Sequence, residues 1–186
     1  MVVDNPVFNR RAMQLHRLTA WEACYAVNMA IACAISYAVI TQLLAGFINE
    51  ANTQLGGMWA VVATVFVFRE TRASTLSAGT ARFIATCVSF VLCLVYLLIF
   101  PVTGPGIAVV IGLGTVAMMM MGRQDDIVTA GITTAVVLVV AERAPEHAWQ
   151  QPLLRLFDTV VGIGVGVLCK WCTSYAFFRV QGVPAR

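Results

Sequence analysis

Six long apolar runs divide this chain, and their lengths constrain its fold more than any other feature. The runs cover about residues 21–47, 55–68, 76–100, 106–121, 127–141 and 153–178. A helix rises ~1.5 Å per residue, so only the first, third and sixth runs are comfortably long enough to cross ~30 Å of hydrocarbon. The sequence therefore predicts an all-α integral membrane protein of about six transmembrane helices. Four spans with two re-entrant segments are an alternative interpretation.

The composition supports lipid as the solvent of these runs. The chain is 60% hydrophobic and 11% charged, whereas soluble domains carry about 25% charged residues. A net charge of +3, dispersed along the sequence, gives no reason to expect a nucleic-acid partner. We expect a basic N-terminal segment at 1–20, one membrane domain at 21–178, a short tail at 179–186 and no soluble domain.

Basic residues are concentrated on one predicted side of the membrane. The side that would hold both termini carries Arg10, Arg11, Arg17, Arg69, Arg72, Arg82, Arg123, Lys170, Arg179 and Arg186. The other side carries only Arg143 and Arg155. Because basic residues accumulate on the cytoplasmic side, this distribution predicts cytoplasmic termini in a bacterial inner membrane. Residues 9–19 read either as an amphipathic surface helix or as a plain positive anchor.

The two halves of the chain show a weak internal repeat. Residues 81–92 align with 154–165, which places Arg82 on Arg155 and Thr86 on Thr159. Upstream, 57–70 aligns with 129–142, which places Glu70 on Glu142. Three helices per repeat would invert the second unit, so the pattern predicts a 3+3 inverted repeat of the kind found in many transporters.

Arginine within a spanning helix costs a few kcal/mol or more, so Arg82 and Arg155 need an explanation. One interpretation is that Arg69, Arg72 and Arg82 reach back to the lipid headgroups as anchors. The other is an anion path with one arginine near each mouth, in which Glu70 would temper the positive field.

The residues that share a helical face with each arginine fit an anion path. Steps of three and four place Arg82 with Thr86, Ser89 and Cys93. On the last span the corresponding face holds Arg155, Asp158, Thr159, Gly162 and Gly166. Asp158 reads either as a neutralising partner of Arg155 or as a titratable group for proton coupling. The glycines read first as a close helix-packing motif, and otherwise as a pore lining.

Two stretches resemble a known family. W-A-V-V-A-T-V-F-V-F-x-x-T-x-A-S-T-L-S-x-G-x-x-R-F-x-x-T, from Trp59 to Thr86, is similar to the second and third spans of the aromatic acid exporter superfamily. That group includes the bacterial fusaric acid resistance (FUSC-like) proteins and, more remotely, the plant aluminium-activated malate channels. Residues 122–167 look like the later spans of the bacterial members, with R-x-x-D-T-x-x-G opening a helix.

The resemblance implies a six-helix membrane unit that assembles as an oligomer and moves carboxylate-bearing compounds. By analogy with the malate channels, Arg82 and Arg155 would line the path. Many relatives carry a second membrane unit or a large cytoplasmic domain, and we expect neither in this chain. We therefore keep a non-transporting membrane subunit or scaffold as the alternative function.

The sequence predicts no enzyme, because it contains no nucleophile–base pair, paired-carboxylate site or phosphate loop. No metal and no cofactor are expected. The expected partners are a small organic anion, the bilayer and a second copy of the chain, with a dimer favoured. The candidate substrate or pore residues are Arg82, Arg155, Thr86, Thr159, Asp158, Arg69, Arg72, Glu70 and Trp59.

Overall fold

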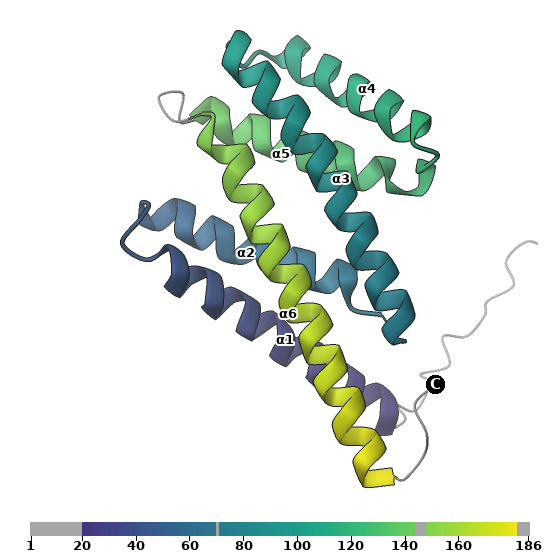
Figure 1. Ribbon diagram of the computed structural model, residues 1–186. Coiled ribbons are helices and arrows are strands. Elements are labelled where there is room, and N and C mark those ends of the chain that lie inside the picture. Colours follow the sequence, from purple (N-terminus) through teal and green to yellow (C-terminus); the bar gives the residue numbers. More distant parts are fainter. Residues whose placement is uncertain (1–19, 70, 144–147, 182–186) are drawn as a thin grey trace, which may run out of the picture.

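The computed structural model describes residues 20–69, 71–143 and 148–181, and in this part the fold consists of helices (Figure 1). The elements are α1 (Ala20–Leu44), α2 (Glu50–Val67), α3 (Arg72–Ile99), α4 (Gly104–Met120), the 3-10 turn η1 (Gln124–Asp126), α5 (Ile127–Arg143) and α6 (Gln150–Gln181). The predicted all-α membrane fold with six helices is confirmed. The predicted basic segment before residue 20, Glu70 and the tail after residue 181 lie outside the described residues, as does the side chain of Arg72.

Four helical segments of the described chain are long and apolar enough to cross a membrane. They are Glu22–Leu44, Ala73–Ile99, Gln124–Arg143 and Gln150–Tyr175, and α4 is a shorter apolar helix. The expectation that the fifth run is too short is wrong, because η1 leads directly into α5 and together they give 20 residues. The polar first turns of α2 lower its hydropathy, and it packs between α1 and α6.

Capping residues explain why several helices begin earlier than the apolar runs. The side chain of Asn49 accepts a hydrogen bond from the backbone of Asn52, so α2 starts at Glu50 instead of Leu55. Thr71 and Ser74 form a reciprocal capping box at the start of α3, within the charged interruption between the second and third runs. A capping side chain satisfies amide groups that the helix itself leaves without acceptors. The charges around Arg69 therefore mark a helix-to-helix turn.

The two halves of the bundle pack in the same way. α2 lies against α6 as α5 lies against α3, and α1 contacts α2 and α6 as α4 contacts α5 and α3. α3 and α6 cross at the centre and run in opposite directions, and α1 and α4 also run in opposite directions (Figure 1). This is the arrangement of the predicted 3+3 inverted repeat.

Buried positions follow the same repeat. The buried stripe of α1 is Ala32, Ser36 and Ile40, and that of α4 is Val110, Gly114 and Met118, each with a step of four. Each stripe faces the helices that pack against it. The first helix of each three-helix repeat therefore buries one narrow face.

Contacts between helices correct the predicted alignment of α2 with α5. The carbonyl oxygen of Ala60 faces Gly162, since an added Cβ there would lie 2.4 Å from it. In the other half, the Ser89 hydroxyl donates to the carbonyl oxygen of Ala130 at 2.9 Å. Gly162 and Ser89 are equivalent in the predicted repeat, so Ala60 corresponds to Ala130. The alignment from sequence instead placed Ala60 on Ile132, two residues too far along.

Each end of the bundle brings together a defined set of helix ends. We call the end where α1 begins and α6 finishes the proximal end, and the opposite end the distal end. The Tyr25 ring of α1 packs on the Phe68 ring that follows α2, with centroids 5.3 Å apart, and Lys170 of α6 lies over both rings. At the distal end, Asn52 near the start of α2 meets Gln151 at the start of α6.

Candidate functional site: two buried arginines

Arg155 is buried in the distal half, between α6 and α2. Its side chain is 3% exposed, and its Nη1 atom lies 3.2 Å from an Asp158 carboxylate oxygen on the next turn of α6. Nη1 also donates to the carbonyl oxygen of Leu55 at 3.4 Å, and the guanidinium lies 5.7 Å from the centre of the Trp59 ring. The spacing of three residues along α6 holds acid and base together. Of the two interpretations of Asp158, neutralisation of Arg155 is therefore present in the structure.

The distal site leaves several polar atoms without hydrogen-bond partners. Both oxygens of Asp158 are in this group, and the contact with Arg155 at 3.2 Å is an ion pair. Nε and Nη2 of Arg155 and Oε1 of Gln151 are also without partners. Gly56 opposes the carboxylate, and a Cβ there would lie 2.9 Å from Asp158 Oδ1. A side chain at this position would crowd the acid.

Arg82 is buried to the same degree in the proximal half, but in different electrostatic surroundings. It is 4% exposed, and its guanidinium lies 4.8 Å from the centre of the Phe66 ring of α2. Its Nε atom has no hydrogen-bond partner. Among the described residues, no carboxylate forms an ion pair with it.

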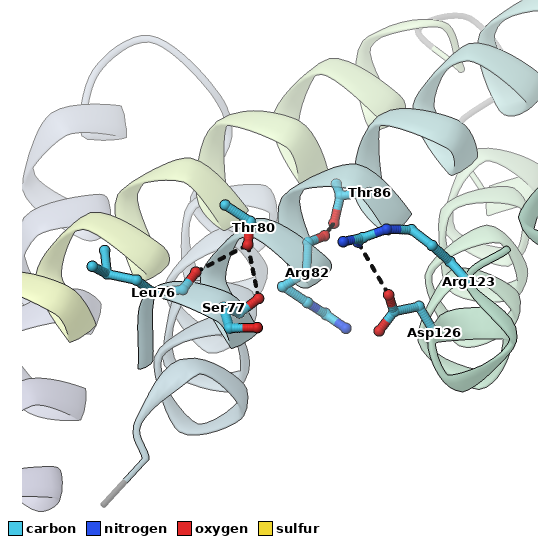
Figure 2. Close-up of polar contacts among 7 residues, drawn as sticks. All are labelled: Leu76, Ser77, Thr80, Arg82, Thr86, Arg123 and Asp126. Atoms are coloured by element: carbon cyan, nitrogen blue, oxygen red, sulfur yellow. Dashed lines mark hydrogen bonds and ion pairs between the residues drawn. The ribbon is translucent and has the colours of Figure 1, made fainter. Parts of the chain in front are cut away.

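A pocket of about 400 Å³ adjoins Arg82 between the end of α2, the start of α3 and the start of α5. It is lined by Phe66, Arg69, Ala78, Ala81, Arg82, Asp125, Asp126, Val128 and Thr129. Figure 2 shows the Arg82 side chain directed toward Asp126, while Asp126 itself is held by Arg123 at 3.2 Å. The acid toward which Arg82 points is thus already engaged by another arginine, and that ion pair is partly exposed.

The hydroxyl groups behind the arginines are used in helix packing. The predicted α3 face is buried, with Thr86 and Ser89 each 1% exposed and Cys93 fully buried. Thr86 donates to the carbonyl oxygen of Arg82 at 2.9 Å, and Ser89 donates to Ala85 and Ala130. The idea that these hydroxyls line an open path does not describe this conformation, in which they bond to backbone carbonyls.

The corresponding face of α6 is closed in the same way. Thr159 is 3% exposed. Gly162 sits against the backbone of α2, where Thr64 donates to its carbonyl oxygen at 3.0 Å. The first interpretation of the glycine motif, close helix packing, is the one observed.

The structure therefore sorts the predicted site residues into two groups. Arg82 and Arg69 share the proximal pocket, whereas Arg155, Asp158 and Trp59 meet at the distal site. Two contributors were not singled out from the sequence. Gln151 could have been found, because it precedes Arg155 by four residues on the same face of α6. Asp126 could not, since only the fold brings the start of α5 next to α3.

These features define a multi-pass helical membrane protein with a buried basic group in each half. The chain belongs to the fusaric acid resistance protein-like family, which matches residues 43–169. The predicted resemblance to this family is confirmed, and it makes the chain a membrane transporter or resistance protein. No curated protein and no solved structure matches the chain. The remote similarity to malate channels stays a prediction.

Proposed function

We propose that the protein is a transporter or channel that exports small organic, aromatic carboxylates. The observation that carries this proposal is the Arg82 pocket. It offers a buried guanidinium, not engaged by any described acid, at the edge of a space of about 400 Å³. Ligand pockets for small molecules are commonly about 300–1,000 Å³ and combine apolar walls with a few polar groups.

The chemistry of the pocket suits an aromatic acid. The fork of Arg82 can hold a carboxylate with two hydrogen bonds. Phe66 supplies an aromatic wall beside it, and the exposed Arg69 adds positive field at the opening. Charges of one sign at a low-dielectric cleft raise the local concentration of oppositely charged ligands.

We also propose that the proximal end is cytoplasmic and that the chain resides in a bacterial inner membrane. Arg69, Arg82, Arg123 and Lys170 lie in the proximal half, whereas the distal half has Arg143 and Arg155. This distribution follows the positive-inside tendency. Reporter fusions at Thr103 and Glu146 should read as external, and a fusion at Gln124 as internal. An external signal at Gln124 would overturn this orientation.

A homo-oligomer, with a dimer favoured, is the assembly that we propose. We expect the second subunit to shield α2 and α5, because both helices keep exposed apolar side chains within one chain: Met58, Val65, Phe66, Val128, Ile132 and Val139. The family resemblance also supports an oligomer. Native mass spectrometry from lipid discs tests it, and a single monomeric species at all protein concentrations would count against it.

The test of transport is flux of labelled organic acids into proteoliposomes. Arg82→Ala should reduce flux about tenfold or more, since a charge-assisted hydrogen bond contributes about 1.5–3 kcal/mol. Arg82→Lys should retain part of it, and Arg69→Ala should have a smaller effect because exposed charges are screened by salt. Arg155→Ala should impair transport from the outer side.

Arg143→Ala is the matched control, since Arg143 is an exposed arginine at the end of α5. An Arg82→Ala protein with normal abundance and unchanged flux for every acid would overturn the proposal. In that case Arg82 is an anchor. If the wild-type protein also moves no acid, a scaffold role becomes the better account.

A further inference from the structure

We infer that Gln151, Arg155 and Asp158 form a proton-entry path in the distal half, with Asp158 as the proton-binding group. The inference depends on the proposed function, because it supplies the coupling for export. It assigns a second site, separate from the Arg82 pocket. Gln151, Arg155 and Asp158 lie at steps of four and three, so they form one stripe that runs inward from the distal end of α6.

Every member of this stripe is buried and incompletely bonded. Gln151 is 1% exposed, Arg155 3% and Asp158 0%. Each has at least one side-chain atom without a hydrogen-bond partner. All three side chains lie against α2, where Gln151 contacts Asn52, Arg155 contacts Leu55 and Asp158 faces Gly56. Buried polar groups are normally satisfied by protein or by ordered water. Five such atoms on one face of α6, beginning in its first turn at the distal end, are suited to water and proton transfer.

Asp158 is the group on this line that can accept the proton. Its only charged contact among the described residues is Arg155 on its own helix. On the helices packed against α6, the other described charges lie elsewhere: Glu50 starts α2, Glu142 and Arg143 end α5, Arg82 serves the proximal pocket and Glu22 starts α1. Addition of a proton therefore changes one ion pair alone, from neutral to a net charge of +1.

This change couples the proton to the anion. When a proton from the distal side binds the Asp158 carboxylate, Arg155 loses its counter-ion and can hold a substrate carboxylate in its place. When Asp158 releases the proton toward the proximal side, its carboxylate binds Arg155 again and displaces the substrate toward the distal side. Asp158 and the substrate thus compete for one guanidinium. Export of the anion and entry of the proton move charge in the same electrical sense, so a membrane potential that is negative inside favours both.

The test compares two modes of transport in the same proteoliposomes. Exchange of labelled for unlabelled acid without a gradient measures substrate handling, and accumulation driven by a pH gradient measures coupling. Asp158→Asn resembles the protonated side chain, so we expect exchange to persist and gradient-driven accumulation to be lost. Glu142→Gln, a neutralised acid in an exposed position at the same end, should leave both modes unchanged.

A second variant tests the proton path even if Asp158→Asn does not fold. Gln151→Leu interrupts the stripe while leaving the ion pair intact, and it should slow gradient-driven accumulation without affecting exchange. Retained gradient-driven accumulation in Asp158→Asn, or in Gln151→Leu if the first variant does not fold, would overturn the proton path alone. Absence of any flux in the wild-type protein would overturn the proposed function and this inference together.

Discussion

Arg82 and Arg155 occupy equivalent positions in the two halves of the molecule, yet only one of them has an acid of its own. Both are nearly fully buried, at 4% and 3% exposure, and both lie against an aromatic ring of α2. Arg155 holds Asp158 three residues along the same helix. Arg82 has no such residue, because the repeat places Ala85 where α6 has Asp158.

The difference lies in which helix carries the acid. An acid three residues away on the same helix is held beside its arginine by the helix geometry itself. Asp126 belongs to the turn before α5, where Arg123 binds it first (Figure 2). A scaffold with nearly symmetric packing therefore carries an asymmetric charge pattern, with a neutralised arginine at one end and one facing a pocket at the other.

The largest expected difference between the two arginines is in stability. Removal of one partner of a buried ion pair typically costs about 3–5 kcal/mol, because the other charge is left uncompensated. Arg155→Ala should therefore lower the free energy of unfolding by about this amount, and Arg82→Ala by clearly less. Unfolding in detergent, followed by circular dichroism, measures both. The double variant Arg155→Ala/Asp158→Leu should recover most of the loss, and equal losses for the two single variants would remove the distinction.

The next largest expected effect compares two faces of α6 in their tolerance of a larger side chain. A methyl group at Gly162 would meet the Ala60 carbonyl at 2.4 Å, whereas a methyl group at Gly164 would meet nothing within 4 Å. Gly162→Ala should destabilise by about 1–3 kcal/mol through overpacking. Gly164→Ala should be neutral or stabilising by up to ~1 kcal/mol through helix propensity. Equal thermal midpoints for the two proteins would show that α2 and α6 can separate at little cost.

Hydroxyl-to-carbonyl hydrogen bonds allow a finer comparison of the contact between α2 and α6 with the contact between α3 and α5. Thr64 donates to Gly162 in one half, and Ser89 donates to Ala130 in the other. Each substitution by alanine should cost about 0.5–1.5 kcal/mol. Thr64→Ala should cost more than Ser89→Ala, because the Thr64 hydroxyl also contacts Ser36 at 2.5 Å. The reverse order, measured by denaturant unfolding, would show that the contact with Ser36 does not strengthen the Thr64 hydrogen bond.

Much of this comparison could be predicted from the sequence, and the limits have physical causes. Hydropathy locates six helices, and the shared Arg and Thr positions identify α3 and α6 as equivalent. Small apolar residues dominate α2 and α5, so nothing in their pattern fixes the register that places Ala60 on Ala130. Asp158 is visible as a partner because it is local to Arg155, whereas the engagement of Asp126 depends on a turn at Gly122, whose φ is +68°.

Arg123→Ala should have only a small effect on stability, and it is the sharpest test of the comparison. The Arg123–Asp126 pair is partly exposed, with side chains 31% and 21% accessible, so its loss should cost at most ~1 kcal/mol. Transport should nevertheless fall several-fold, because Asp126 becomes available to neutralise Arg82 and the proximal site then resembles the distal one. Arg123→Ala/Asp126→Asn removes the competing acid and should restore flux in the proteoliposome assay. If Arg123→Ala leaves flux unchanged, or if the double variant does not recover it, then Asp126 does not control the charge of the Arg82 pocket.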